Sequence, residues 1–446
     1  MTEFRALMTP RRRPIAIWSA VLGIVLLACG PAPTIASGGL AVGTAGVRST
    51  AGAGPPDPAF YTVPSPLPLG APGDLIRSEA LNMSSRAGFA GTGYRIMYHS
   101  RSVSGADIAV TGLAAVPTAA APPGGRAIVD WAHGTTGTAD SCAPSRDRGA
   151  SRFFDVAGPV VAAGYDVVGT DYEGLGTPGL HPYLVGPSEG RSVLDAARAI
   201  RHLVSAHAST SYAIWGHSQG GHATLWATQL AASYAPELRL VGSVPLAPAS
   251  HVTAIYAFRT FDRSDDWGYL VMFLAGLNAA YPSAPLARVF TKAGLAKLDV
   301  VNTGCEAQSI AAYRGHAGPY WFGGDPHDDG VFGPLMDAQE PGRVPTQTPI
   351  LLLQGVADEI VPEGATITLA GAMCATGQHL ELRTYPGANH DGVLVPGLPV
   401  ALAWTRDRLA GRTPGNDCPR LLAASKPPPA SASAAAPMLA PMRLTG

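Results

Sequence analysis

The 446-residue chain contains few charged residues and almost no lysine. Asp, Glu, Lys and Arg make up only 14% of the sequence, and lysine occurs only at Lys292, Lys297 and Lys426. The net charge of −1 provides no basic excess to attract a phosphate backbone, so we do not expect nucleic acid as a partner. The hydrophobic content of 46% is sufficient for a large buried core.

Cysteine is also scarce, and its spacing matches no zinc pattern, so we do not expect a metal ion. Beyond Cys29 the chain has an even set of cysteines. This set predicts two disulfides if the chain is exported, and three pairings are open. The four residues are Cys142, Cys305, Cys374 and Cys418.

The sequence has no long apolar run near its start that could comfortably span a bilayer. Arg11, Arg12 and Arg13 precede the short apolar run 15–28, as in a secretory signal peptide. Cleavage after Ala36 would remove a signal peptide of residues 1–36, and lipid attachment at Cys29 is the alternative. Either exit predicts a protein that is secreted or associated with the cell envelope.

The ends of the mature chain differ in composition from its middle. Residues 37–55 are rich in Gly, Ala, Ser and Thr and predict a flexible leader. Residues 419–446 are rich in Pro and Ala, and we expect them to be disordered. The segment 56–418 between them is predicted to form one domain.

Within this domain apolar strands and amphipathic helices alternate. Such alternation favours an α/β fold with a mainly parallel sheet and helices on both faces. Two earlier runs, 94–98 and 107–116, flank Ser104-Gly105 and predict an antiparallel hairpin. The predicted strands are 127–131, 165–170, 211–216, 240–246, 350–353 and 380–385, and the predicted helices are 153–163, 188–206, 223–234, 367–374 and 400–409.

Residues 249–347 interrupt this alternation. The interval contains a helical apolar stretch, 269–277, and loops rich in Gly, Pro and Asp. Because the flanking strands should be neighbours in one sheet, we interpret the interval as a largely helical lid inserted into the domain. A second independent domain is the alternative, but the flanks lack the composition of linkers.

Ser218 lies at the point where a predicted strand meets a predicted helix. Gly216, Ser218 and Gly220 form a G-x-S-x-G pattern, in which small neighbours allow a strained turn to lift the serine hydroxyl above the sheet. The pattern alone also fits a surface turn. The strand before it and the helix after it favour a nucleophile.

A serine nucleophile needs a base, and the base needs an acceptor that fixes its tautomer. Asp358 follows the strand 350–353, and His390 follows the strand 380–385, so the order Ser218, Asp358, His390 is that of an α/β-hydrolase. The alternatives are neighbouring acids and histidines, which we interpret as bracing, orienting or packing groups. They are Glu359, Asp391, Asp171, His217 and His222.

The reaction of a serine nucleophile also needs two donors for a developing oxyanion. One is expected to be the backbone N–H of Gln219, the residue after the serine. The other is expected from the loop after the strand 127–131, at Thr135 or Thr136. A surface turn rich in glycine is the alternative for that loop.

In combination these motifs resemble the secretory lipase family of fungi and actinobacteria, the lipase A type. The segments that carry the resemblance are Phe60-Tyr61, His133-Gly-Thr-Thr-Gly137, Cys142-Ala-Pro-Ser145, Asp171-Tyr-Glu-Gly-Leu-Gly176, residues 186–198 and Gly216-His-Ser-Gln-Gly220. The chain departs from several relatives at Gln219, where they have glycine. It also has a glycine-threonine form of the oxyanion loop.

The resemblance implies an α/β-hydrolase that cleaves carboxylic esters, such as triacylglycerols, without a cofactor. It implies a lipid or small ester as substrate and transient contact with lipid surfaces. It also implies the disulfides Cys142–Cys305 and Cys374–Cys418. The rival hypotheses are an exported peptidase or amidase on the same fold and a binding protein without activity.

The apolar stretch of the insertion is expected to bind the acyl chain of the substrate. Leu270, Phe273 and Leu274 are the residues for which we expect this role. The alternative is that these side chains form the core of the insertion itself.

Overall fold

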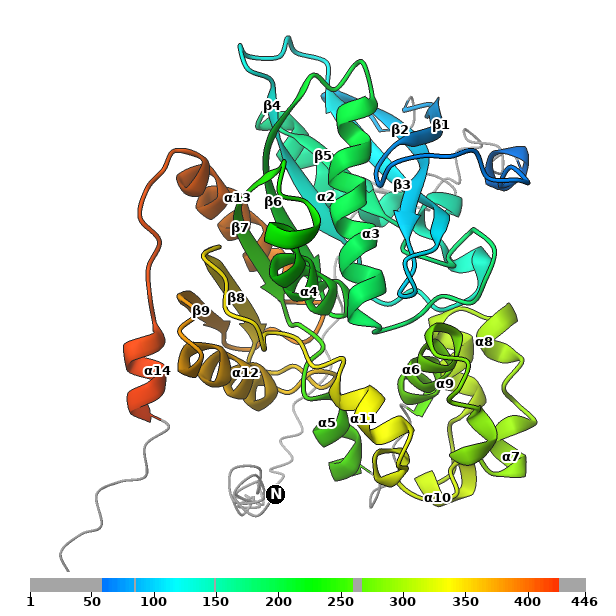
Figure 1. The fold of residues 1–446 in the computed structure, drawn as a ribbon. Coiled ribbons are helices and arrows are strands. Elements are labelled where there is room, and N and C mark those ends of the chain that lie inside the picture. The colour runs from blue at the N-terminus through cyan, green and yellow to red at the C-terminus, as the bar shows by residue number, and fades with distance from the viewer. Residues whose placement is uncertain (1–57, 84–85, 148–149, 260–266, 425–446) are drawn as a thin grey trace, which may run out of the picture. The chain divides into compact units, whose positions relative to one another are not determined.

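The computed structural model describes residues 58–83, 86–147, 150–259 and 267–424 (Figure 1). The predicted signal peptide and leader lie outside the described residues, as does the tail from residue 425. The expectation of disorder from residue 419 is wrong for its first residues. The helix α14 (Cys418–Ala424) forms there because Leu421 is buried against the sheet and a neighbouring helix.

A sheet of nine strands forms the centre of the fold, in the order β1-β2-β3-β5-β4-β6-β7-β8-β9. The first three strands are antiparallel to their neighbours, and the strands from β5 to β9 are parallel, so the expected hairpin and mainly parallel sheet are both present. The bounds are β1 (Leu75–Ala80), β2 (Gly91–Arg101), β3 (Asp107–Pro117), β4 (Arg126–Ala132), β5 (Asp166–Thr170), β6 (Ala208–His217), β7 (Arg239–Leu246), β8 (Ile350–Gly355) and β9 (Leu380–Tyr385).

Helices cover both faces of this sheet (Figure 1). On one face pack α3 (Gly186–Ala199), α4 (Gln219–Tyr234) and α12 (Glu363–Ala375), and on the other pack α2 (Ser151–Ala162) and α13 (Leu394–Leu409). The strand β8 shows why the central strands are apolar throughout. Ile350 and Leu352 contact one helical layer while Leu351 and Leu353 contact the other, so neither face can be polar.

Helix ends differ most from the sequence predictions. Helix α3 ends at Ala199 and continues as a short 3-10 turn, Ile200–His202, whereas the prediction extended the helix to residue 206. Helix α13 begins at Leu394, six residues before its predicted start. Pro396 is tolerated there because the N–H groups of a first helical turn have no partner within the helix. The strand β1 was not predicted.

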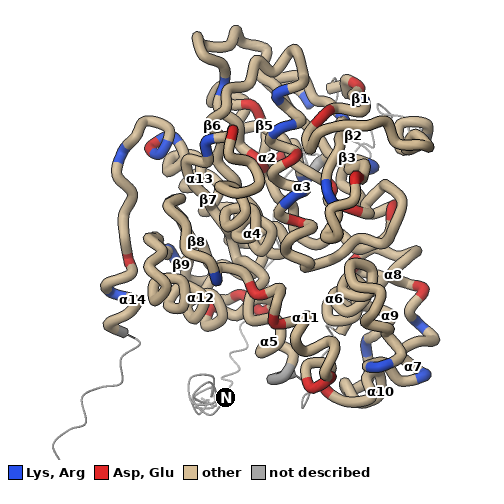
Figure 2. The backbone as a smooth tube through the Cα atoms, in the orientation of Figure 1, with Lys and Arg blue, Asp and Glu red and all other residues tan. Residues whose placement is uncertain are grey.

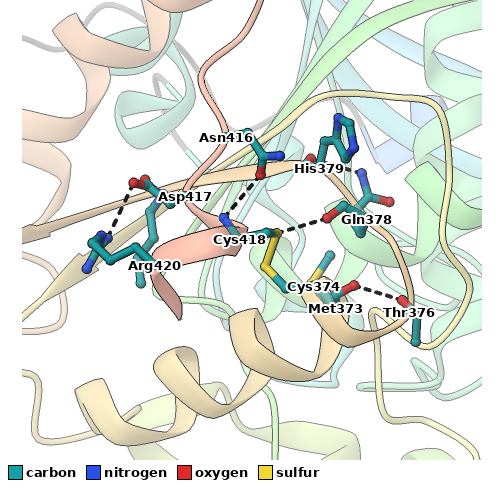
Figure 3. Close-up of a disulfide and its surroundings, with 10 residues drawn as sticks. Met373, Cys374, Thr376, Gln378, His379, Asn416, Asp417, Cys418 and Arg420 are labelled. Atoms are coloured by element: carbon teal, nitrogen blue, oxygen red, sulfur yellow. Dashed lines mark hydrogen bonds and ion pairs between the residues drawn. A yellow bond between two sulfur atoms is a disulfide. The ribbon is translucent and has the colours of Figure 1, made fainter. Parts of the chain in front are cut away.

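The C-terminal segment covers the outer edge of β9. Asp417 donates its N–H to the carbonyl of Leu380 at 2.8 Å, and its carboxylate accepts the N–H of Leu382 at 2.9 Å. The bond Cys374–Cys418, which we name the edge disulfide, fastens this segment to α12 (Figure 3). An exposed edge strand could otherwise pair with another chain, so this segment protects the sheet.

The insertion lies between β7 and β8 and consists of short helices (Figure 1). Its largest buried side chains, among them Trp267, Tyr313 and Trp321, form an apolar cluster that also includes residues 183–185 from the segment before α3. The bounds are α5 (Val252–Arg259), α6 (Trp267–Ala280), α7 (Lys292–Leu295), α8 (Val300–Thr303), α9 (Glu306–Ala312), α10 (Gly318–Trp321) and α11 (Phe332–Asp337).

The bond Cys142–Cys305, which we name the insertion disulfide, joins the insertion to the loop after β4. The two disulfides of the structure are therefore the two that the resemblance implies. Charges of both signs are interspersed along the described chain (Figure 2).

Candidate active site

Ser218 occupies a strained turn between β6 and α4. Its φ of 58° and ψ of −117° are unusual for a residue with a side chain. The turn is held by the backbone of the neighbouring strand, since the Ser218 N–H donates to the carbonyl of Leu246 at 3.0 Å and its carbonyl accepts the N–H of Ala249 at 3.0 Å. This geometry agrees with the predicted nucleophile elbow.

The two glycines of the motif are required by close backbone contacts. A Cβ atom on Gly216 would overlap the carbonyl of Gly220, and a Cβ on Gly220 would overlap the carbonyl of Ala132 at the end of β4. Only residues without side chains allow the helix to start so close to two strands. Helix α4 therefore begins at Gln219, four residues earlier than predicted.

Asp358 and His390 lie on adjacent loops and form a hydrogen bond. His390 Nδ1 is 2.8 Å from Asp358 Oδ2. The other carboxylate oxygen, Oδ1, accepts the N–H groups of Ile360 and Val361 at 2.9 and 2.8 Å. Gln354 donates to Oδ2 at 3.0 Å. The carboxylate is thus oriented at both oxygens, and Oδ2 is shared by the imidazole and Gln354.

His217 connects the serine turn to the histidine loop. Its Nε2 donates to the carbonyl of His390 at 2.9 Å, and the two rings lie 4.6 Å apart between centroids. Burial, together with the nearby charge of His390, lowers the pKa of His217 to about 4. A neutral ring suits a single donated hydrogen bond, so His217 is an orienting group, as interpreted from the sequence. Ser218 and His390 remain 8% and 9% exposed.

The predicted oxyanion loop lies beside the serine. A Cβ atom built on Gly134 would stand 3.6 Å from the Cβ of Ser218. Because glycine has no side chain, nothing at this position separates the loop from the serine turn. The Thr135 hydroxyl is bonded to the Tyr183 hydroxyl at 2.8 Å, and the carbonyl of Thr136 accepts the N–H of Glu306 at 2.9 Å. The loop is therefore held both by the insertion and by the segment before α3.

Asp171, the rival acid, lies in a different environment. Its carboxylate accepts the N–H of Ser145 at 2.9 Å and the hydroxyl of Thr111 at 2.7 Å. Burial raises the pKa of Asp171, and these hydrogen bonds partly offset that rise. Asp171 braces the loop after η2 (Asp140–Cys142), as interpreted from the sequence.

The three residues predicted to bind the acyl chain are buried. Leu270, Phe273 and Leu274 belong to the apolar cluster of the insertion, which also includes residues 183–185 from outside it, and each is no more than 2% exposed. Phe273 also lines a small cavity together with Met336 and Ala249, which follows β7 and donates its N–H to the Ser218 carbonyl. This burial favours the alternative, a packing role, for Leu270 and Leu274, and the acyl-binding role stays a prediction.

Some residues that support the site were not found from the sequence. Gln354, which orients Asp358, is the one polar side chain at the end of the apolar strand β8, and that position was a usable signal. Tyr183 and Glu189 lie far from the serine in sequence. Nothing in their local pattern indicated that they contact Thr135 and Gln219.

The described residues contain no helix long and apolar enough to cross a membrane. They also contain no group of three or more His, Cys, Asp or Glu side chains placed to hold a metal ion.

Comparison of the chain with protein families matches residues 155–417 to the secretory lipases. Lipase A of Moesziomyces aphidis is 27% identical over 396 residues, which are 82% of each chain. A secreted triacylglycerol lipase of Malassezia globosa is 28% identical over 65% of this chain and 67% of its own. A Mycobacterium tuberculosis relative, 25% identical over 80% of this chain and 83% of its own, is described as a probable inactive lipase.

Solved structures share the fold. Candida antarctica lipase A in its closed state superposes with a TM-score of 0.69 at 23% identity, over 81% of this chain and 88% of that one. The rice cell wall degrading esterase LipA of Xanthomonas oryzae superposes with a TM-score of 0.62 at 20% identity, over 77% of this chain and all of that one. Both comparisons support an α/β-hydrolase fold.

Proposed function

The chain belongs to the secretory lipase family, and from this premise we propose that it is an exported serine hydrolase that cleaves carboxylic esters. Triacylglycerols or shorter acyl esters are the proposed substrates, and Ser218, Asp358 and His390 are the proposed catalytic triad. One relative is described as inactive, so the proposal depends on residues present in this chain. The observation that carries it is the Asp358–His390 hydrogen bond beside the strained Ser218 turn.

In the first step, Ser218 Oγ attacks the carbonyl carbon of the ester and its proton passes to Nε2 of His390. Asp358 accepts from Nδ1 and stabilises the imidazolium that forms. The developing oxyanion is stabilised by the N–H of Gln219 and by an N–H of Thr135 or Thr136. Collapse of the tetrahedral intermediate breaks the bond to the alcohol, which leaves with the proton from His390.

In the second step, water attacks the acyl-enzyme and gives a proton to His390. The bond between Ser218 and the acyl group breaks, the carboxylic acid leaves, and the proton returns to Ser218 Oγ. One ester and one water thus yield one acid and one alcohol, and no cofactor takes part in this scheme.

We also propose that residues 249–347 form a lid over the site. The loop that would supply the second oxyanion donor is bonded to Glu306 of this insertion. A lid of this kind would limit water around the acyl-enzyme and offer apolar surface to a fatty chain. The signal peptide of residues 1–36, or lipid attachment at Cys29, would bring the enzyme outside the cytoplasm.

A panel of substrates tests the proposed function. Nitrophenyl esters of increasing chain length should be hydrolysed, and peptidyl nitroanilides should not. A fluorophosphonate should label Ser218. Ser218→Ala should lower kcat by about 10³-fold or more while the melting temperature stays near that of the wild type.

Ser243→Ala is the matched control, because Ser243 is a buried serine on β7 that bonds Thr228. This variant should keep its activity. Faster cleavage of the anilides than of the esters would favour the peptidase or amidase instead, and full activity of Ser218→Ala would exclude the serine mechanism.

A further inference from the structure

The side chain of Gln219 is completely buried, and its NH₂ group is hydrogen-bonded. The backbone N–H of the same residue is the proposed oxyanion donor. The amide Nε2 donates to Glu189 Oε1 at 2.8 Å and lies 2.8 Å from His181 Nε2. Both partners are also fully buried, and Glu189 belongs to α3, which packs against α4. The residue after the nucleophile is thus held at its backbone and at the end of its side chain.

The chemistry of the partners fixes the orientation of this amide. His181 Nδ1 donates to the carbonyl of Glu173 at 2.8 Å, which leaves Nε2 as an acceptor. Burial lowers the pKa of His181, in agreement with a neutral ring. The Glu189 carboxylate is also an acceptor, so the amide group must face both partners with its NH₂ group. A reversed amide would place its oxygen against two acceptors.

Glu189 is itself held on several sides. Its Oε1 accepts the N–H of Leu184 at 2.9 Å, and its Oε2 lies 2.7 Å from Nδ1 of His222. The other ring nitrogen of His222, Nε2, lies 2.8 Å from the carbonyl of Gln339. Both ring nitrogens of His222 therefore face oxygen acceptors, so the ring links Glu189 to Gln339.

This network connects three parts of the fold. His222 lies one helical turn after Ser218, and its N–H donates to the Ser218 carbonyl at 3.1 Å. Gln339 follows α11, where the insertion returns toward the sheet, and its side chain accepts the N–H of Gly186 at 3.0 Å. The contacts are interior to the protein and lie on the side of α4 that faces α3.

We propose that the Gln219 side chain, held by Glu189 and His181, is a positioning group that fixes the direction of the Gln219 backbone N–H. The peptide that carries this N–H follows the strained Ser218, and strained backbone persists only where surrounding contacts determine it. Anchoring the side chain restricts rotation of the same peptide. The inference rests on the proposed function, because it presumes that this N–H stabilises an oxyanion.

Gln219→Met tests this role, since it keeps the length of the side chain and removes its donors. We expect kcat for nitrophenyl butyrate, counted per serine titrated with a fluorophosphonate, to fall about 10- to 100-fold, because small displacements of catalytic groups have effects of this size. KM should change little. The inhibition constant of a trifluoromethyl ketone, which mimics the tetrahedral intermediate, should rise in parallel with the loss of kcat/KM.

Gln378→Met is the matched control. Gln378 is another buried glutamine, and its side chain accepts the N–H of Thr346 at 2.8 Å and donates to the carbonyl of Thr348 at 2.9 Å. It lies next to the edge disulfide (Figure 3). This variant should lose thermal stability but keep the wild-type kcat per titrated serine. A loss of kcat equal to that of Gln219→Met would overturn the proposal.

Glu189→Gln provides a second route if Gln219→Met does not fold. It preserves shape and removes the charge, and it should lower kcat as well. Combined with Gln219→Met it should add little further loss, since the two residues act as one unit. Fully additive losses would contradict that unit.

The result also separates this inference from the proposed function. If the wild-type enzyme is neither labelled at Ser218 nor active on esters, the proposed function fails. If the wild type is labelled and active and Gln219→Met turns over at the wild-type rate per titrated serine, the positioning role alone fails.

Discussion

Replacing Asp358 by Asn should leave the fold intact and remove most of the activity. Oδ1 of Asp358 accepts two backbone N–H groups, from Ile360 and Val361. The amide oxygen of an asparagine would take this place, since its NH₂ group cannot accept them. That NH₂ group would then face Nδ1 of His390. In the variant Nδ1 would therefore meet a hydrogen-bond donor, whereas in the wild type it meets the carboxylate, an acceptor.

The expected size of the effect follows from the tautomer. Nδ1 of His390 would have to become the acceptor, and the proton would move to Nε2, the nitrogen that must accept the proton of Ser218. An aspartate-to-asparagine change that inverts a catalytic histidine in this way lowers kcat by about 10⁴-fold, which corresponds to about 5.5 kcal/mol of transition-state stabilisation. With its amide group rotated by 180°, the asparagine would place its NH₂ group against the two backbone N–H donors. This orientation is therefore unfavourable and would not restore the wild-type tautomer.

The assay is the hydrolysis of nitrophenyl butyrate per serine titrated with a fluorophosphonate, together with thermal unfolding. Glu359→Gln is the control, because Glu359 is the neighbouring carboxylate that the sequence left as an alternative. It should keep most of the wild-type kcat. The reasoning is refuted if Asp358→Asn retains a tenth or more of the activity, or if Glu359→Gln loses as much as Asp358→Asn.

Three further predictions concern pH, disulfides and the insertion. The wild-type kcat/KM should rise through a single ionisation between about pH 5 and 8 as the base loses its proton. His217 should not add a second ionisation, because burial lowers its pKa to about 4 and keeps its ring neutral in this range. A flat profile would contradict the assigned base. Replacing both cysteines of the insertion disulfide by serine should lower kcat. The same change at the edge disulfide should lower only the free energy of unfolding, by about 2 to 5 kcal/mol. Equal kcat values in the two variants would contradict a role for the insertion disulfide in holding the oxyanion loop. Phe273→Ser should change the ratio of long-chain to short-chain ester hydrolysis, while Leu270→Ser and Leu274→Ser should lower the melting temperature without changing that ratio; an identical ratio in all three would remove Phe273 from the acyl site.

The sheet and the order of the site residues could be predicted from the sequence because both depend on local patterns. Apolar runs of four to eight residues marked the central strands, and the loops after them placed Asp358 and His390 at one edge of the sheet. The glycines around Ser218 carried a steric signal, which the contacts of Gly216 and Gly220 explain. The disulfide pairing did not follow from the residues and came from the family resemblance.

The remaining features depend on contacts between residues distant in sequence. Apolar side chains such as Leu270 and Leu274 fit an acyl-binding surface and a buried core equally well. The sequence does not distinguish these roles, because they differ only in how α6 packs against the residues around it. Gln219 appeared as a backbone donor alone. The Gln219 side chain is hydrogen-bonded to residues 30 and 38 positions earlier in the chain, and no local sequence pattern indicates such contacts.

The insertion is covalently attached to the rest of the protein at three places, its two ends and the insertion disulfide, and this limits how it can move. A segment joined only at its two ends can swing about the line between them. The insertion disulfide adds a covalent joint beside α8 and α9, which Figure 1 shows on the opposite side of the insertion from α5 and α11. Because of this third attachment, the insertion cannot rotate as a rigid body about the line between its two ends. Opening of the proposed lid would therefore require rearrangement within the insertion, and a displacement of α9 would carry the Thr136 loop along with it.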